Sequence, residues 1–495
     1  MDAARAFLVA LVGAGLLLGV TRLIVGDWLR AGLIASRILL LFFSYGHVYG
    51  VMKTAGWGAS VGRHRYLAPA FGLVFLLSTF FILRRLRDPA PLTSALNWIS
   101  AALVALPVVS LGAYLLNPPP RPEPPASTQE LRLPAGVPPD VYYIILDAYA
   151  RQDTLERVYE YDNEAFIRFL RERGFYVADG SRSNYAQTGL SLGSSMNMDY
   201  IEALVPELES GSRGRQTLWE LIQHSEVRRR LEALGYETVA FSSGLPGTEI
   251  RDADVYLSPG TADETLSLEG SNPFESMLAQ TTMLRLVSDG VVALPRFIPA
   301  LDYPYQIHRT RIRYILDMLD EVPASSRPRF VFAHVISPHP PFVFGPEGQE
   351  ITPDAPFTLK FTFDSGPSSS VDEYLRGYRG QVVFVNREIQ RIIDSILAHA
   401  ATTPVIIIQG DHGPDSTSTR VSYVQERMTN LNAYLLPTGD AGLYPAITPV
   451  NSFRVVFNEV FGGKYEILPD RVLYSEYRKP YSFFDVTDLI RQPAE

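Results

Sequence analysis

Two short apolar runs of this sequence are each followed by residues that could bind a metal ion. Asp147 follows residues 141–146 (VYYIIL). Asp411 and His412 follow residues 405–409 (VIIIQ), with a glycine on either side in the order GDHG that allows the backbone to turn sharply. Two carboxylates and an imidazole offer oxygen and nitrogen ligands to a divalent cation. A single aspartate after a strand is more often a cap or turn residue, so the paired occurrence is what predicts a metal site.

A third stretch, residues 184–197, is rich in hydroxyl and small side chains and leads into a predicted helix. Its hydroxyls include Thr188, Ser191 and Ser194. The free backbone amides and the dipole at the start of a helix stabilise an anion. A hydroxyl bound to a divalent cation also loses its proton more easily and becomes a nucleophile. The alternative is that these hydroxyls only cap the helix.

Residues 189–193 (GLSLG) also satisfy the nucleophile-elbow pattern G-x-S-x-G, with Ser191 as the serine. That turn requires a buried strand directly before it, and the preceding residues 181–188 (SRSNYAQT) are polar. Its acid and histidine must come from separate loops, whereas Asp411 and His412 are adjacent. The pattern therefore does not favour a serine hydrolase.

Two further histidines follow another apolar run. His334 and His339 lie in residues 332–342 (FAHVISPHPPF), where prolines stiffen the loop after a predicted strand. For His334, a place in the core or in a turn is an equally good interpretation. For His339, which lies between prolines in a loop, a functional role is favoured.

The elements that must position these residues alternate between strands and helices. Apolar β-rich runs occur at 141–146, 236–241, 329–333 and 405–409, and helical spacing occurs at 163–173 and 374–399. This alternation predicts an α/β fold with a mostly parallel sheet covered on both faces. Because ligands bind at the carboxyl ends of strands in such sheets, we expect the candidate residues to meet at one edge.

The first 117 residues differ in character from the rest. They carry a net positive charge within a chain of net charge −9, and they contain four apolar stretches, at 6–25, 31–52, 66–83 and 96–116. Each is about long enough to cross a bilayer as a helix. A cleavable signal peptide would explain the first stretch but not the next three. Arg37 and His47 interrupt the second span, and we favour snorkelling of Arg37 over a transport role.

The basic residues indicate an orientation. The run 84–87 (RRLR) after the third span is the strongest basic cluster and places that loop in the cytoplasm, although Lys53, Arg63 and Arg65 favour the opposite side. Residues 118–140 are proline-rich and form a spacer. We therefore expect a multi-pass protein of the inner or plasma membrane with three parts: transmembrane residues 1–117, linker 118–140, and an extracytoplasmic domain of residues 141–495.

Composition excludes several other classes of protein. The chain has no cysteine, which rules out disulfides, iron–sulfur clusters, thiol nucleophiles and a cysteine-derived formylglycine. Charged residues make up 20% and the net charge is negative, which does not favour nucleic acid as a partner.

The ordered set Asp147, Thr188, His339, Asp411 and His412 resembles the sulfatase branch of the alkaline phosphatase superfamily. The resemblance is to membrane-anchored members such as lipoteichoic acid synthases and phosphoethanolamine or phosphoglycerol transferases. It implies a sulfatase-like α/β/α domain after several transmembrane helices.

The resemblance also implies roles for these residues. Asp147, Asp411 and His412 would hold one divalent metal ion (Zn, Mn, Mg or Ca), and Thr188 would be both a ligand and the nucleophile. His339 would stabilise charge on the phosphoryl oxygens or the leaving group. His334 and Ser191 are possible additional site residues. Arg420 and Arg427 could neutralise phosphate, but nothing in the sequence distinguishes them from surface arginines.

The departures from the family pattern shape the expected reaction. Residue 188 is Thr, not the Cys that true sulfatases convert to formylglycine, and no histidine follows His412. We therefore expect phosphoester transfer or hydrolysis with one metal, acting on a phospholipid or glycan substrate in the cell envelope beside the lipid bilayer. The alternatives are a sulfuric ester hydrolase of the sulfatase family and a non-catalytic envelope binding protein with the same fold.

Overall fold

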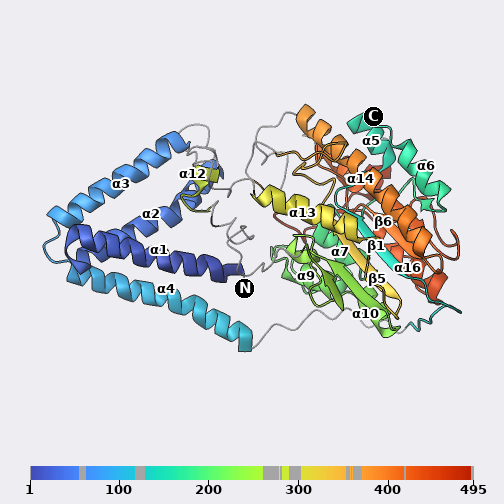
Figure 1. Ribbon diagram of the computed structural model, residues 1–495, viewed down its shortest axis with the longest axis horizontal. Coiled ribbons are helices and arrows are strands. Elements are labelled where there is room, and N and C mark those ends of the chain that lie inside the picture. The colour runs from blue at the N-terminus through green and yellow to red at the C-terminus, as the bar shows by residue number, and fades with distance from the viewer. Residues whose placement is uncertain are drawn as a thin grey trace. The chain divides into compact units, whose positions relative to one another are not determined.

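The chain forms two compact units in a computed structural model that describes residues 2–54, 63–116, 129–259, 278, 281–288, 303–352, 357, 359, 371–416 and 420–491. The first, which we call the membrane unit, comprises Met1–Pro120 and Gly260–Pro304. The second, the soluble unit, comprises Arg121–Pro259 and Tyr305–Glu495. Both are drawn in Figure 1.

Four described helices of the membrane unit are long and apolar enough to cross a bilayer. They are α1 (Asp2–Val25), α2 (Trp28–Thr54), α3 (His64–Arg84) and α4 (Ala90–Leu116). The four predicted spans are confirmed, with slightly longer bounds. Their apolar side chains are largely exposed, as at Leu16 (66%) and Val109 (68%), which suits a surface in contact with lipid tails. On α2, Arg37 is half-buried and His47 is exposed.

The soluble unit is built around a sheet whose seven described strands run in the order β2-β7-β6-β1-β5-β3-β4. β1 pairs in parallel with β5 and β6, and β3 pairs in parallel with β4 and β5. β7 is antiparallel to β6 and β2. The expected α/β fold with a mostly parallel sheet is therefore confirmed. The strands are β1 (Val141–Leu146), β2 (Tyr176–Val177), β3 (Glu237–Phe241), β4 (Val255–Leu257), β5 (Arg329–Val335), β6 (Val405–Gln409) and β7 (Asn432–Leu435).

Both faces of the sheet are covered, which explains why β1 and β6 are apolar throughout. Along β1, Ile144 lies in a buried cluster with Ile389 of α14 (Val371–His399), whereas Tyr143 lies in a second cluster with Phe453 of α16 (Pro449–Phe461). Figure 1 shows β1 and β6 between α14 and α16. A strand buried on both sides has no solvent-facing positions to fill with polar residues.

Shorter helices complete the two layers and the loops between them. The predicted helix at 163–173 corresponds to α6, and the one at 374–399 is longer than expected and begins at Val371. A two-stranded hairpin, β8 (Leu473–Tyr474) with β9 (Phe484–Asp485), follows α16. The remaining elements are α5 (Gln152–Tyr159), α6 (Glu164–Glu172), α7 (Thr188–Ser195), α8 (Ile201–Leu204), α9 (Gln216–Gln223), α10 (Glu226–Ala233), η2 (Pro246–Thr248), α12 (Arg285–Ser288), α13 (Tyr303–Met318), α15 (Arg420–Met428) and α17 (Thr487–Arg491).

The strand register fixes what meets at the carboxyl edge of the sheet. Ile145 of β1 lies beside Gln409 of β6 on one side and beside His334 of β5 on the other. The residues directly after β1 and β6 are therefore neighbours, with His334 next to them.

Candidate metal and phosphoryl-transfer site

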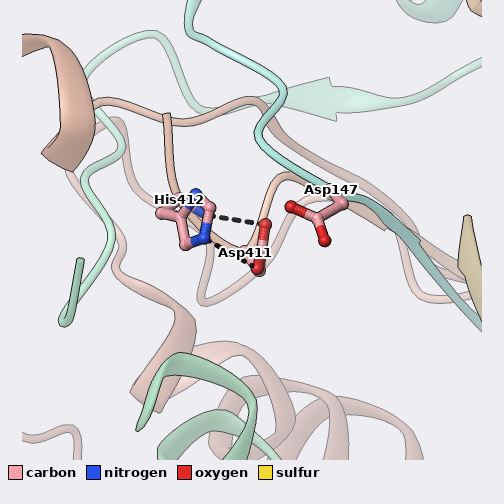
Figure 2. Close-up of side chains that lie close together, drawn as sticks. All are labelled: Asp147, Asp411 and His412. Carbon is pink, nitrogen blue, oxygen red and sulfur yellow. Dashed lines mark hydrogen bonds and ion pairs between the residues drawn. The ribbon is translucent and has the colours of Figure 1, made fainter. Parts of the chain in front are cut away.

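The two aspartates and the histidine that follow β1 and β6 meet at this edge. One potential ligand atom from each of Asp147, Asp411 and His412 lies within 4.8 Å of the others. All three side chains are buried, and Figure 2 shows Asp147 facing the pair formed by Asp411 and His412. The close approach depends on Gly410, because a Cβ at that position would lie 2.4 Å from the Tyr149 carbonyl oxygen.

The carboxylates carry oxygens that the protein leaves without hydrogen bonds. Asp147 Oδ1 and Asp411 Oδ2 are buried and have no hydrogen-bond partner among the described residues. Burial and then the charge of Asp147 raise the pKa of Asp411 to about 7. Burial also raises the pKa of Asp147, but His339, His334 and His412 together bring that pKa below its ordinary value. A bound dication would satisfy both free oxygens and offset their repulsion, so this donor set fits a metal ion.

The hydrogen bonds of His412 fix which ring nitrogen is available to a metal. Nδ1 lies 3.0 Å from the Gly413 carbonyl oxygen, which can only accept, so Nδ1 carries the proton. Nε2 lies 3.0 Å from Nη2 of Arg427, which can only donate, so Nε2 presents its lone pair. Burial and then the Arg427 charge hold the pKa of His412 well below its usual range. The imidazole is therefore neutral, the form that binds metal ions.

Thr188 is placed beside these groups. It is the first residue of α7, and its Oγ1 lies 3.2 Å from Nε2 of His412. The Thr188 hydroxyl is also close enough to the Asp411 carboxyl to lower its pKa slightly, against the larger effects of burial and Asp147. Thr188 is partly exposed, whereas the three metal-ligating candidates are buried. Thr188 therefore combines partial exposure with a hydroxyl that contacts one of the buried candidates.

Ser191 has a different position from Thr188. It is fully buried, and its Oγ donates to the main-chain carbonyl of Asp411 at 2.6 Å. The Ser183 hydroxyl is also 2.6 Å from that carbonyl. Residues 178–187, which precede α7, form no strand. The arrangement does not favour a nucleophile elbow at Ser191, and the serine instead holds the Asp411 backbone in place.

His334 of β5 and His339 of the loop that follows it contact Asp147 in different ways. His334 is buried, with Nε2 3.2 Å from Asp147 Oδ2 and Nδ1 2.8 Å from the Thr248 hydroxyl. His334 thereby orients the Asp147 carboxylate. A buried position in the core and a role at the site, the two interpretations that the sequence left open for His334, are therefore compatible. The backbone amide of His339 donates to the Asp147 carbonyl at 3.0 Å. The His339 side chain is half-buried at the rim, and burial lowers its pKa while Asp147 opposes the change.

Arg427 is the site residue that the sequence did not single out. It is not a surface arginine: its Nε donates to the Ala186 carbonyl at 2.9 Å, its Nη1 to Gly413 at 3.0 Å and its Nη2 to His412. The sequence feature that could have indicated its position is Gly413. A Cβ at this residue would lie 2.0 Å from the Glu426 carbonyl oxygen, so only glycine allows α15, which carries Arg427, to pack against the turn after Asp411 and His412. The side chain of Arg420 lies outside the described residues.

Comparison with known proteins gave similarities among solved structures only. No family model and no curated protein sequence matches the chain. The C-terminal periplasmic domain of EcEptC from Escherichia coli, in complex with Zn, is 9% identical and has a TM-score of 0.46, covering 74% of this chain and 99% of that one. The integral membrane lipooligosaccharide phosphoethanolamine transferase A from Neisseria meningitidis is 10% identical, with a TM-score of 0.40 and coverage of 84% and 76%.

A third similar structure is the lipoteichoic acid synthase LtaP from Listeria monocytogenes. It is 13% identical and has a TM-score of 0.39, with coverage of 67% of this chain and 76% of that one. These proteins are of the kinds that the ordered sequence motifs resemble.

Proposed function

We propose that the chain is a membrane-anchored, metal-dependent phosphoester transferase or hydrolase that acts through Thr188. The observation that carries this proposal is the position of one hydroxyl on a partly exposed residue. Thr188 Oγ1 lies 3.2 Å from the unprotonated nitrogen of His412 and beside two buried carboxylates that each have an unpartnered oxygen.

In this proposal Asp147, Asp411, His412 and Thr188 hold one divalent metal ion, whose identity (Zn, Mn, Mg or Ca) the donor set leaves open. When bound, the ion would lower the pKa of the Thr188 hydroxyl and polarise the phosphoryl oxygens. His334 keeps the Asp147 carboxylate in place through its contact with Oδ2. Ser191 and Ser183 do the same for the Asp411 backbone.

The reaction is a two-step transfer in which the side chains have separate roles. The Thr188 oxygen forms a bond to phosphorus as the bond from phosphorus to the leaving alcohol breaks, and the hydroxyl proton passes to the adjacent Asp411 carboxylate. His339, at the rim, would act in its protonated form and donate from Nε2 to the leaving oxygen or a phosphoryl oxygen, because its Nδ1 proton is already given to the Pro340 carbonyl. An acceptor hydroxyl, from a glycan or from water, then takes the phosphoryl group and restores Thr188.

Arg427 would stabilise the negative charge that develops on the phosphoryl oxygens. Two of its nitrogens are held by backbone carbonyls, and the third donates to Nε2 of His412 and would be released toward the phosphoryl oxygens once a metal ion takes that lone pair. A guanidinium fixed in this way is preorganised and needs little rearrangement when charge develops next to it. It is the only positively charged side chain that the described residues place against His412.

Phosphoester chemistry is favoured over sulfate-ester hydrolysis because the chain has no cysteine from which formylglycine could form, and has Thr at position 188. A non-catalytic binding protein would not need a partly exposed hydroxyl among buried ligands, nor the cost of keeping two carboxylate oxygens without partners. We further propose that the donor is a phospholipid or a lipid-linked glycan in the inner or plasma membrane, and that the soluble unit is extracytoplasmic. The chain would then consist of a transmembrane part (residues 1–117), a linker (118–140) and an extracytoplasmic domain (141–495). Attachment to the bilayer raises the effective concentration of such a donor.

The experiment that tests the proposal compares Thr188→Ala and Thr188→Ser with the exposed control Ser210→Ala in the full-length protein. We measure bound metal by elemental analysis and cleavage of bis-p-nitrophenyl phosphate. Thr188→Ala should lose activity on the order of a thousandfold or more, Thr188→Ser should keep part of it, and the control should match the wild type. Unchanged cleavage by Thr188→Ala would refute a threonine nucleophile.

A further inference from the structure

A stretch of the chain that lies in sequence between two elements of the soluble unit packs against the membrane helices. The chain leaves the sheet after β4, which ends at Leu257, and begins α13 at Tyr303. Residues 278 and 281–288, which include α12, are the described part of the sequence between these elements, and they belong to the membrane unit. Figure 1 shows α12 beside one end of α2. The chain therefore connects the two units at this stretch as well as at the linker after α4.

The contacts of this segment with α2 are specific. The backbone amide of Met283 donates to the Phe42 carbonyl oxygen at 2.8 Å. The guanidinium of Arg285 lies over the Tyr49 ring, 4.4 Å from its centroid. A backbone bond fixes the position of the segment along α2, and a cation over an aromatic ring adds attraction that grows as water is excluded.

The surface that receives Arg285 is itself ordered by contacts between α2 and α3. The Tyr49 ring stacks on His64 with centroids 4.1 Å apart and an interplanar angle of 3°. The Tyr45 hydroxyl lies 2.9 Å from His64 Nδ1, and Tyr45 is fully buried. The Arg285 contact thus meets the junction of two membrane helices and not a single mobile side chain.

The depth of the contact along α2 indicates that the segment enters the bilayer region. Phe42 lies 12 residues before the last residue of α2, Thr54, which corresponds to about 18 Å of helix at 1.5 Å per residue. In a lipid environment an amide without a partner is costly, so the bond from Met283 to Phe42 provides what a re-entrant backbone requires.

The direction of the helices agrees with this placement. Only Gly26 and Asp27 separate α1 from α2, so these two helices run in opposite directions. If each of the four helices crosses the bilayer once, α2 and α4 end on the same membrane face. The soluble unit follows α4 in the sequence, so a segment of that unit can reach the α2 end without crossing the bilayer.

We propose that residues 281–288 are a re-entrant anchor that attaches the soluble unit to the α2–α3 end of the membrane unit independently of the linker at 118–140. A proline-rich spacer alone would let the soluble unit move over a wide range. A second point at which the chain is held by the membrane helices restricts that range. This inference concerns attachment and does not depend on the proposed chemistry.

The absence of cysteine from the chain makes a direct test possible. The full-length protein receives a protease site within the linker and the pair Phe42→Cys with Met283→Cys, since the hydrogen-bonded backbones lie close enough for a disulfide or a short thiol cross-linker. The matched control pair is Leu83→Cys with Met283→Cys. Leu83 lies near the last residue of α3, whereas His64, which contacts the α2 residues next to the segment, is the first residue of that helix. After oxidation and linker cleavage, we measure on a non-reducing gel the fraction of protein whose two fragments remain joined. We expect this fraction to be at least tenfold larger for the first pair than for the control pair.

A second measurement uses the protein without cysteines. After linker cleavage in detergent, the membrane helices should co-purify with the tagged soluble unit, and Arg285→Ala should reduce the recovered fraction several-fold. Arg285→Lys should reduce it less, and the exposed control Arg213→Ala should not reduce it. Equal cross-linking of both cysteine pairs, cross-links found only between differently tagged copies, or complete separation of the cleaved wild-type fragments would each overturn the proposal.

Discussion

A double-mutant cycle on Ser183 and Ser191 tests whether these serines position the metal-ligating Asp411. Both hydroxyls lie 2.6 Å from the main-chain carbonyl of Asp411, and the two hydroxyl oxygens are 3.3 Å apart. Ser183 also lies 2.7 Å from the Tyr185 carbonyl oxygen, so its single proton can go to either acceptor. When Ser191 is replaced by Ala, Ser183 can therefore turn its proton to the Asp411 carbonyl.

The structure sets the size of the expected effects. Each single substitution, Ser183→Ala or Ser191→Ala, removes one of two donors and should cost about 1 kcal/mol of unfolding free energy. The double variant leaves a buried carbonyl without a donor, which should add about 1–3 kcal/mol beyond the sum of the single effects. Because Asp411 then loses its fixed orientation, metal affinity should fall about 10–100-fold in the double variant and much less in each single variant.

The assay is denaturant unfolding together with titration of zinc into the chelator-treated protein. Ser194→Ala is the matched control, since Ser194 is a buried hydroxyl that donates to the Asp199 carbonyl instead. Its substitution should change stability without changing metal affinity. Strictly additive effects on stability, or a metal affinity in the double variant equal to that of the wild type, would show that the two serines do not position Asp411 together. Loss of all activity in Ser191→Ala alone would instead assign the chemistry to Ser191.

Three further results are expected. Arg427→Ala should lower kcat for phosphodiester cleavage by about 10²–10³-fold with a smaller change in KM, because the guanidinium acts on charge that develops in the transition state. Arg427→Lys should recover only part of the lost kcat, since an ammonium cannot reproduce the three contacts of the guanidinium. Equal losses in kcat and in metal content would contradict this role. In zinc titrations, His334→Gln should reduce metal affinity about 10–100-fold, because the contact between His334 and Asp147 Oδ2 is lost. An unchanged affinity would show that the Asp147 carboxylate does not need His334 to orient it. His308 of α13 is buried, and burial, followed by the charge of His339, lowers its pKa to about 3. Below pH 6.5 the unfolded chain therefore binds a proton that the folded protein cannot take up, so the free energy of unfolding should fall as the pH falls from 6.5 toward 3. Thermal melts should show a smaller loss of stability in acid for His308→Asn than for the wild type, and equal losses would exclude this histidine as a cause.

Much of the soluble fold was predictable because the apolar runs that form β1 and β6 are buried on both faces. Their bounds, 141–146 and 405–409, match the structure, and the register places Asp147 next to Asp411 as the rule for parallel sheets requires. The edge strands were not predicted. β2 and β4 have only two and three residues, which is too short for periodicity, and β7 pairs antiparallel through contacts that no local pattern encodes.

The ligand set was also readable from residue types at strand ends, whereas the supporting residues were not. Arg427 reaches His412 only because α15 packs against the turn at Gly413, and that packing is a long-range property. Thr248, which holds His334, lies in a short loop helix with no distinguishing motif. The attachment of residues 281–288 to α2 is likewise invisible in sequence, since it joins residues more than 200 positions apart.

If Thr188 is the nucleophile, its oxygen becomes covalently bonded to phosphorus during the reaction. The most direct measurement is mass spectrometry of peptides from metal-loaded protein that has been mixed with a phosphodiester and quenched in acid. We expect a phosphoryl adduct on the peptide that contains Thr188, assigned to that residue by fragmentation and absent from Thr188→Ala. An adduct on Ser191, or turnover of the substrate without any adduct on Thr188 at any quench time, would contradict a nucleophilic role for Thr188.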